Sequence, residues 1–414
     1  MLATFLLLAL PLQAAPAPFP GMVKIPGGKT WIGTDLKWCK EQIKEHPNSA
    51  NWLAAETPQS QADVPTFYIS PTEVTNEMYL RFVQSTGAFP PANWARITSE
   101  QRLKAIEEGK KKFGPGYVLD ATRLAAWWEL HWQDPDKTWE MPPEIALEPV
   151  VYVNRRDAEA YCAWAGLRLP TEEEWIRAAR GDQKWDYPYG EAFDPTRIAF
   201  EATKPRKMAY KILPVNSFPA NASPFGCVDM VGNVYELTAS GFHSLPGFKT
   251  FRVRPKGLDP IDVAPNWDSA AAVIKGGAYN QKAIAERIGN RPGINPLYRS
   301  PFVGFRVAAS AKPVKDALGS AALGVQAALL GDVPEQFFNL NEPSGLERRR
   351  YADLAKIAAA RKKPLKVPAT QPPAGYAIFD GYDNLGVLPV GNWPSPASTA
   401  WTGKPRGSAR SSWG

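Results

Sequence analysis

The chain has 414 residues, of which 44% are hydrophobic, and its 15 Trp, 32 Gly and 41 Pro favour a loop-rich globular fold over a helical bundle. Three cysteines allow at most one disulfide, and three histidines far apart in the sequence (His46, His131, His243) argue against a His-rich zinc or iron site. The net charge of +7 is uneven, because residues 312–414 carry 13 basic and 8 acidic side chains and the rest of the chain is close to neutral.

Residues 1–17 have the pattern of a secretory signal peptide. An apolar run from Leu2 to Leu10 is followed by Pro11 and small residues, with candidate cleavage points after Ala14 and after Ala17. This run is too short to span a bilayer, and no other stretch is long and apolar enough to do so. The alternative is a buried N-terminal apolar segment. We expect an exported protein of the periplasm, cell envelope or extracellular space, without a transmembrane segment in the mature chain.

Short strands and a capped helix are predicted next, around a first insertion. The block "GMVKIPGGKTWIGTD" predicts a β-hairpin that turns at Gly27-Gly28. The block "VPTFYISPTEVTNEMYLRFVQSTG" predicts a strand and then a helix capped by Thr75. Residues 37–61 between these blocks are expected to form a polar helical insertion.

Residues 89–148 are predicted to form a second insertion. Its part "TSEQRLKAIEEGKKK" has a Ser or Thr cap and a helical pattern, and its part "LAAWWELHW" is rich in aromatic residues around His131. The aromatic part suits either a ligand platform or packing against the body of the protein, and we favour packing.

The block "EPVVYVNRRDAEAYCAWAGLRLPTEEEWIRAARG" predicts a strand, two helices and a turn. The strand covers Val150–Val153, the first helix runs from residue 155 to about 165, the turn falls at Gly166, and Thr171 caps the second helix. The three acids from Glu172 to Glu174 suit either a metal or acid–base site, or a helix start, where carboxylates complement the helix dipole. The helix start explains all three more simply.

The character of the sequence changes near residue 311. Residues 312–363 predict a helical extension, and residues 364–414, rich in Pro, Gly, Ser and Trp, predict an extended tail. A basic extension on an exported protein suggests an envelope protein complex or an anionic cell-envelope polymer as partner, or else only a solubilising role. We expect no nucleic-acid partner.

Seven blocks occur in an order that resembles the formylglycine-generating enzyme family, also called the sulfatase-modifying factor family, over about residues 20–311. They are "MVKIPGGKTWIGTD", "FYISPTEVTNEMYLRFV", "PVVYVNRRDAEAYCAWAGLRLPTEEEWIRAARG", "YPYG", "PFGCVDMVGNVYELT", "IKGGAY" and "VGFRVA". The resemblance implies a C-type-lectin-like α+β fold of short twisted antiparallel sheets with few helices, here with a helical and extended C-terminal extension.

The resemblance also indicates a divergent member of the family. Formylglycine generators oxidise a sulfatase cysteine with two cysteines that bind copper(I), a soft ion suited to thiolates. Laid without gaps from Gly276-Gly277, those two positions fall on Gln281 and Glu286, and the three cysteines of this chain lie in other blocks. We therefore expect neither copper nor formylglycine generation.

The family often pairs a cysteine at the position of Val307 with one at the position of Cys162. That bridge cannot form here, so Cys162 is expected to be a small buried residue.

The resemblance implies one structural calcium site, in the block "DMVGNVYE". Asp229 and Glu236 would supply carboxylate oxygens, and Gly232 and Val234 would supply backbone carbonyls. The alternative is a plain Gly-Asn turn with exposed acids. The family's other calcium site is in doubt, because Arg197 stands where an Asn ligand is expected.

Two functions remain open. The first is a non-catalytic binding or scaffold protein of the cell envelope, for example in a motility or secretion machine. The second is an enzyme that uses the same cleft to mature a siderophore or another small molecule or protein. The candidate cleft residues are Tyr279, Asn280, Gln281, Glu286, Arg287, Asn290 and Arg291.

The basic candidates have a further interpretation. Arg287, Arg291 and Arg299 could hold a carboxylate or phosphate, or could bond to loop carbonyls, which we favour. Arg306 is expected to be structural.

Overall fold

The computed structural model describes residues 21–119, 121–134, 136–200 and 212–311, together with the strands β14 (Tyr376–Ile378) and β15 (Val387–Pro389), which pair with each other. The predicted signal peptide, the predicted helical extension and the rest of the predicted tail lie outside the described residues. Within them, no helix is long and apolar enough to cross a membrane.

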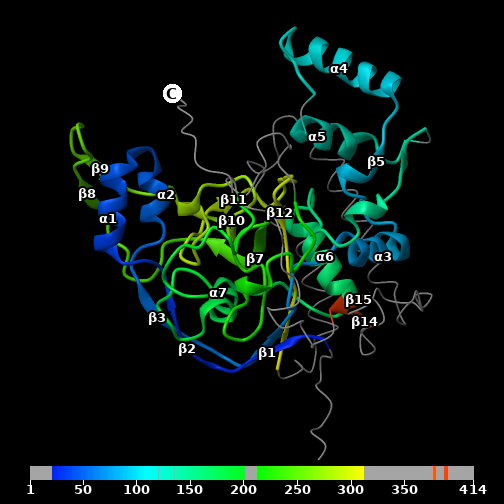
Figure 1. The fold of residues 1–414 in the computed structure, drawn as a ribbon. Coiled ribbons are helices and arrows are strands. Elements are labelled where there is room, and N and C mark those ends of the chain that lie inside the picture. Colours follow the sequence, from blue (N-terminus) through cyan, green and yellow to red (C-terminus); the bar gives the residue numbers. More distant parts are fainter. Residues whose placement is uncertain are drawn as a thin grey trace, which may run out of the picture.

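Two small sheets form the centre of the fold (Figure 1). The first has the order β1 (Val23–Ile25), β4 (Phe67–Ile69), β13 (Ala308–Ser310), and all its pairs are antiparallel. The second has the order β11 (Gly293–Ile294), β10 (Asp268–Lys275), β7 (Tyr235–Phe242), β12 (Val303–Gly304), with β12 parallel to β7. Because β1 and β13 both pair with β4, the two ends of the described domain meet in one sheet.

The predicted hairpin at Gly27-Gly28 is wrong. The strand β1 pairs with β4, while β2 (Gly28–Ile32) pairs with β3 (Ser60–Val64) in a separate ribbon. Both ladders share one register, since Ile25 faces Phe67 and Gly28 faces Val64. The chain therefore continues straight through the glycines and reverses only at the first insertion. Proline lacks the N–H that a ladder needs, and Pro26 and Pro65 interrupt the ladder at the same level of both strands.

Three helices of the body begin at the caps that local chemistry provides. They are α3 (Asn76–Thr86), α6 (Arg155–Ala165) and α7 (Glu172–Arg180). The Thr75 hydroxyl accepts from the Met78 N–H, and Thr171 forms a capping box with Glu174. The predicted helix starts at these two threonines are thus confirmed. The predicted strand Val150–Val153 is wrong: Tyr152 has a left-handed φ of 58°, which interrupts an extended strand.

The body has two cores, one on each side of the first sheet. The larger core stacks Tyr79 of α3 on Tyr161 of α6, with ring centroids 5.8 Å apart, and Phe305 meets both rings edge-on. The second core gathers around Trp175 of α7, which is fully buried. Aromatic rings of this kind bury a large apolar area each and fix the relative placement of the helices and sheets.

The two insertions stand on opposite sides of the body (Figure 1). The first contains α1 (Leu36–Glu45), η1 (Pro47–Ser49) and α2 (Ala50–Ala54), and it shares a small core with the ribbon of β8 (Phe251–Val253) and β9 (Ile261–Val263). It is helical as expected, although the predicted end at residue 61 overlaps β3.

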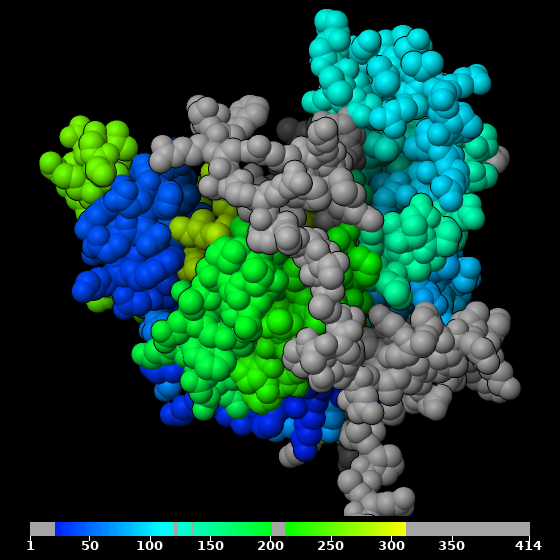
Figure 2. All heavy atoms as spheres, viewed as in Figure 1, coloured from blue at the N-terminus to red at the C-terminus, as the bar shows by residue number. Residues whose placement is uncertain are grey.

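The second insertion projects from the body (Figures 1 and 2). Its elements are η2 (Ala92–Trp94), β5 (Ala95–Arg96), α4 (Ser99–Phe113), α5 (Ala121–His131), β6 (Thr138–Trp139) and η3 (Pro143–Ile145). Trp128 is fully buried against Phe89 and donates its indole N–H to the Pro90 carbonyl (2.9 Å). His131 lies 2.8 Å from the Asp134 carboxylate. These contacts agree with packing, rather than ligand binding, for the aromatic cluster.

Candidate functional site

The segment from Lys275 to Arg291 begins with the last residue of β10 and leaves this strand through two glycines. Gly276 and Gly277 both have left-handed φ angles, 96° and 76°, which glycine adopts without strain. A Cβ on Gly277 would lie 2.2 Å from the Glu286 carboxylate, so this residue also leaves room for that side chain. The Gly276 carbonyl accepts from the Gly232 N–H (2.7 Å), which joins the segment to the loop of the predicted calcium site.

The two positions expected to carry copper-binding cysteines have very different surroundings. Gln281 is partly exposed and donates to the Asn280 side chain (3.1 Å). Glu286 is fully buried; its Oε1 accepts from the Ala278 N–H (3.2 Å), and its Oε2 has no hydrogen-bond partner. Burial raises the pKa of Glu286 well above its usual value, which favours the neutral form of the carboxyl. An amide and a carboxyl group form no soft donor pair for copper(I).

The thiols lie elsewhere. Cys39, Cys162 and Cys227 are all free and buried, and each belongs to a different core. Burial raises the pKa of Cys39 to about 12, that of Cys227 to about 11 and that of Cys162 well above its usual value. No two of them can act together as thiolates. Cys162 shares its core with Val307, which confirms the prediction of a small buried residue.

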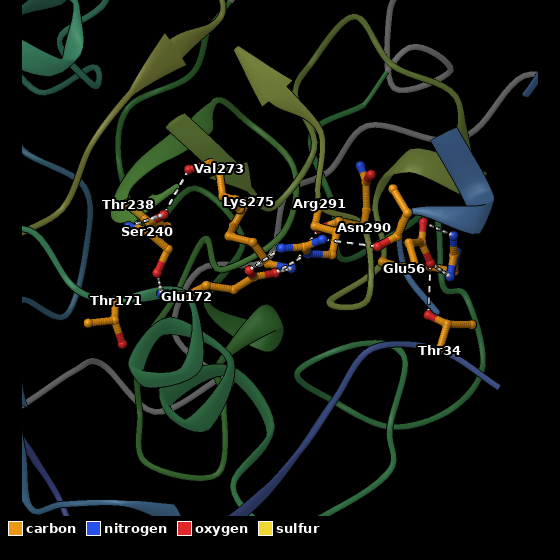
Figure 3. A network of polar contacts seen from close by, with 12 residues as sticks. Thr34, Glu56, Thr171, Glu172, Thr238, Ser240, Val273, Lys275, Asn290 and Arg291 are labelled. Carbon is orange, nitrogen blue, oxygen red and sulfur yellow. Dashed lines mark hydrogen bonds and ion pairs between the residues drawn. The ribbon is translucent and has the colours of Figure 1, made fainter. Parts of the chain in front are cut away.

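Two of the candidate arginines hold buried carboxylates. Arg287 makes two hydrogen bonds with Glu56 of the first insertion (2.9 and 2.8 Å) and stacks over the Trp38 ring at 4.2 Å. Arg291 makes two with Glu172 at the start of α7 (both 2.9 Å), as Figure 3 shows. Both guanidinium groups are buried, so they tie the segment to the first insertion and to α7.

Arg291 also binds the Ala55 and His243 carbonyls (3.0 Å each), in agreement with the expected bonding to loop carbonyls. The third arginine, Arg299, is buried between Glu129 of the second insertion and Asp157 of α6. All three arginines therefore connect parts of the fold.

Lys275 completes the network around Glu172 (Figure 3). Its ammonium lies 3.4 Å from Glu172 Oε1 and donates to the Asn290 carbonyl (2.6 Å). Burial by itself would raise the pKa of Glu172, but Arg291 and Lys275 more than offset it and hold the pKa at about 2. Burial in turn lowers the pKa of Lys275 to about 8 against the attraction of Glu172. Sequence reasoning explained Glu172 as a helix start and missed Lys275, because their partners are more than a hundred residues away along the chain.

Asn290 and Tyr235 close the buried side of the segment. The Asn290 amide donates to the Tyr235 hydroxyl (3.2 Å) and to the Ala285 carbonyl (2.5 Å), whereas its Oδ1 has no partner. Among the seven candidate cleft residues, Glu286, Arg287, Asn290 and Arg291 are thus buried, and Tyr279, Asn280 and Gln281 are partly exposed.

The predicted calcium ligands are brought together only in part. Asp229 and Glu236 are both buried rather than exposed, which argues against the plain turn with exposed acids. Glu236 binds the Arg306 guanidinium through both oxygens (2.5 and 2.6 Å) and accepts from the Trp175 indole (2.8 Å). Its charge is therefore compensated within the protein. These contacts also agree with the expected structural role of Arg306.

Glu73, which sequence reasoning missed, lies beside Asp229. It is fully buried, and burial together with the charges of Asp229 and Glu236 raises its pKa well above the usual value. Burial also raises the pKa of Asp229 to about 6, and Glu73 Oε2 has no hydrogen-bond partner. The sequence signal was an acid between Thr72 and Val74 in an otherwise uncharged turn.

These two carboxyls fit a hard cation by their chemistry, because carboxylate oxygens are its preferred ligands and the burial of both acids penalises their charge. Within the described residues, however, no three His, Cys, Asp or Glu side chains converge as metal ligands. The residue in doubt for the second calcium site, Arg197, pairs with Asp194 (3.0 Å).

A family profile described as the sulfatase-modifying factor enzyme 1-like domain matches residues 9–311. The chain therefore belongs to this family, and the predicted C-type-lectin-like α+β fold with short antiparallel sheets is confirmed. The inactive C-alpha-formylglycine-generating enzyme 2 of Mus musculus is 31% identical over 329 residues, which cover 74% of this chain and 91% of that protein.

Two other relatives carry the names of active enzymes. The formylglycine-generating enzyme of Bos taurus is 29% identical over 328 residues, covering 72% of this chain and 77% of that protein. The hercynine oxygenase of Mycolicibacterium smegmatis is 30% identical over 301 residues, covering 71% and 63% respectively. Since three names with different activities occur at nearly equal identity, the degree of identity assigns no activity, and the site residues have to decide.

Proposed function

We propose that this chain is a non-catalytic member of the family that serves as a binding or scaffold protein. The observation that carries the proposal is the pair Gln281 and Glu286 at the positions where the resemblance places copper-binding cysteines. No other thiol can substitute, because the three cysteines are buried in three separate cores. The similarity to a relative named inactive agrees with this reasoning.

The binding surface of this proposal is the turn after β10. Tyr279, Asn280 and Gln281 present partly exposed polar side chains there. Behind them, the buried pairs Arg287–Glu56 and Arg291–Glu172 hold the segment in place. A polar surface on a rigid support suits recognition of a partner.

We further propose that the protein is exported and acts in the cell envelope, for example in a motility or secretion machine. This part rests on sequence alone: the apolar N-terminal run and the surplus of positive charge after residue 311. The basic extension would bind an envelope protein complex or an anionic polymer.

The alternative is an enzyme that matures a siderophore or another small molecule or protein in the same cleft. One observation favours it: Glu286 is a buried carboxyl with a raised pKa and an unpartnered oxygen, and the Asn290 Oδ1 nearby in sequence is also unpartnered. Buried acids with raised pKa values occur often at catalytic sites, where they donate protons.

Affinity purification from native envelopes separates the two functions. A stable, stoichiometric complex that requires residues 312–414 and survives Glu286→Gln supports the scaffold. Binding or conversion of a small molecule that is lost in Glu286→Gln, while the complex persists, supports the enzyme and refutes the non-catalytic proposal.

We also propose a structural calcium ion at Asp229, with Glu73 as an additional carboxylate. Two neighbouring buried carboxyls with raised pKa values support it, because a bound cation would stabilise their charged forms against the cost of burial. The backbone at Gly232 and Val234 remains the proposed source of carbonyl ligands. Glu236 contributes less than the resemblance implied, because Arg306 already neutralises it.

A further inference from the structure

The outer end of the second insertion exposes large apolar side chains. Leu103 is 62% exposed, Phe113 50% and Val118 63%, and they are three of the five large hydrophobic residues that the described part of the chain exposes. Leu103 and Phe113 lie on α4, which Figures 1 and 2 show at the end of the insertion away from the body, and Val118 lies in the segment that follows α4. We call residues 103–118 the arm tip. Apolar residues gathered in one projecting place suggest a surface that is covered in use.

The large apolar residues of α4 lie on a stripe distinct from its packed side. Leu103, Lys110 and Phe113, which are exposed, and Ile106, which is partly exposed, follow helical spacing, three and four residues apart, so they share one face. The packed side is marked by Ala105 and Gly109, both buried; a Cβ on Gly109 would lie only 2.0 Å from the Tyr117 ring. The stripe is therefore left over after α4 has packed within the insertion.

The apolar stripe ends in a group of positive charges. Lys110, Lys111 and Lys112 are exposed in the last turn of α4. Glu107 and Glu108 lie one turn earlier, yet the structure gives none of these lysines an ion-pair partner among the residues it describes. Lys112 lies over the Phe113 ring (5.1 Å). Cations that extend over exposed apolar side chains are typical of surfaces that meet an anionic membrane, where the rings enter the interface and the ammonium groups reach the headgroups.

Charge narrows the choice of partner. The C-terminal residues 312–414 carry 13 basic and 8 acidic side chains, so they would be repelled by the lysines of the arm tip. A second copy of the arm tip would bring like charges face to face. An anionic bilayer matches both the apolar stripe and the lysines.

We propose that the arm tip docks the protein on an anionic phospholipid surface, with Phe113 and Val118 entering the interface and Lys110, Lys111 and Lys112 binding the headgroups. This docking is peripheral and reversible. It does not depend on whether the cleft is catalytic.

The test uses the full chain and flotation with vesicles of phosphatidylglycerol and phosphatidylcholine, or of phosphatidylcholine alone. The variant replaces Lys110, Lys111 and Lys112 by glutamate, which reverses their charge. Since each basic residue near an anionic surface contributes roughly a fivefold factor, partitioning should fall on the order of 100-fold. The matched control reverses Lys37, Lys249 and Lys256, which are exposed elsewhere and change the net charge equally. The vesicle partitioning of this control should stay within about threefold of that of the wild type, because charges far from the membrane contact are screened.

A fluorescent reporter locates the contact. All three native cysteines are buried, so Phe113→Cys offers one reactive thiol for an environment-sensitive dye. With anionic vesicles its emission should shift to the blue, whereas Leu258→Cys, at an equally exposed position (54%) outside the arm tip, should not respond. Any of three results overturns the proposal. The dye at position 113 shows no blue shift, the control variant loses as much vesicle binding as the arm-tip variant, or the protein binds an acidic protein and no vesicle.

Discussion

Replacing Arg291 by methionine tests the buried network around Glu172. The substitution keeps the length of the side chain and removes its charge, leaving Glu172 with Lys275 as its remaining partner at 3.4 Å. Breaking a buried ion pair by removing one partner costs about 3–5 kcal/mol.

The pKa of Glu172 gives a second value for the free energy that its buried ion pairs contribute. It falls from 4.5 to about 2 in the folded protein, and each unit corresponds to about 1.4 kcal/mol, so the charged form is stabilised by about 3 kcal/mol. Because the folded pKa lies below the unfolded one, this stabilisation is complete above about pH 4.5 and is lost as the pH falls towards 2.

Urea unfolding followed by tryptophan fluorescence measures both effects. At pH 7, Arg291→Met should lose about 3–5 kcal/mol in the free energy of unfolding. The matched control is Arg96→Met, which breaks an exposed pair with Glu140 and should cost less than about 1 kcal/mol. The difference in the free energy of unfolding between the wild type and Glu172→Gln should shrink as the pH falls from 4.5 to 2. Two results refute the reasoning. Either Arg291→Met and Arg96→Met lose equal free energy of unfolding, or the difference between the wild type and Glu172→Gln does not change with pH.

Three further predictions concern the acids, the glycine turn and the thiols. In EDTA at pH 7, Asp229→Asn should be at least as stable as the wild type, because the folded pKa of about 6 lies above the usual 3.8 and the charged form is penalised as the pH rises through this window. Calcium should raise the melting temperature of the wild type only, and no calcium response in the wild type contradicts the proposed ion. Gly277→Ala should cost at least about 1 kcal/mol, because of its left-handed φ and the close Glu286 carboxylate; adding Glu286→Ala should restore part of this loss in a double-mutant cycle, and strict additivity argues against the contact. Native protein should show no thiol that reacts rapidly with a disulfide reagent, and all three should react in urea; a fast native thiol shows that the buried positions are wrong.

Local chemistry predicted the helix starts well. The side chains of Thr75 and Thr171 bond to backbone groups three residues later, so a short window of sequence contains the whole interaction. The hairpin prediction at Gly27-Gly28 failed for the opposite reason. The true partner strands begin more than thirty residues later, and the glycines suited a turn that the chain does not make.

The candidate site likewise has features that a local pattern predicts and features that only the fold brings together. The absence of thiols at Gln281 and Glu286 could be predicted from the sequence, because the block at Gly276-Gly277 resembles the family and fixes the spacing to the two cysteine positions. That Glu172 binds Arg291 and Lys275 could not, because the pairing depends on three segments that only the fold brings together. Glu73 was missed because its relevance comes from burial beside Asp229, which no local pattern records.

The first insertion is not a detachable module. It supplies the Glu56 carboxylate to Arg287 and the Ala55 carbonyl to Arg291, so its removal would leave the buried Arg287 without its paired carboxylate, whereas Arg291 would keep Glu172. A shortened chain would then need a compensating change at Arg287. The insertion and Arg287 therefore form one structural unit, because a chain that lacked the first would bury a guanidinium charge that no longer has its carboxylate partner.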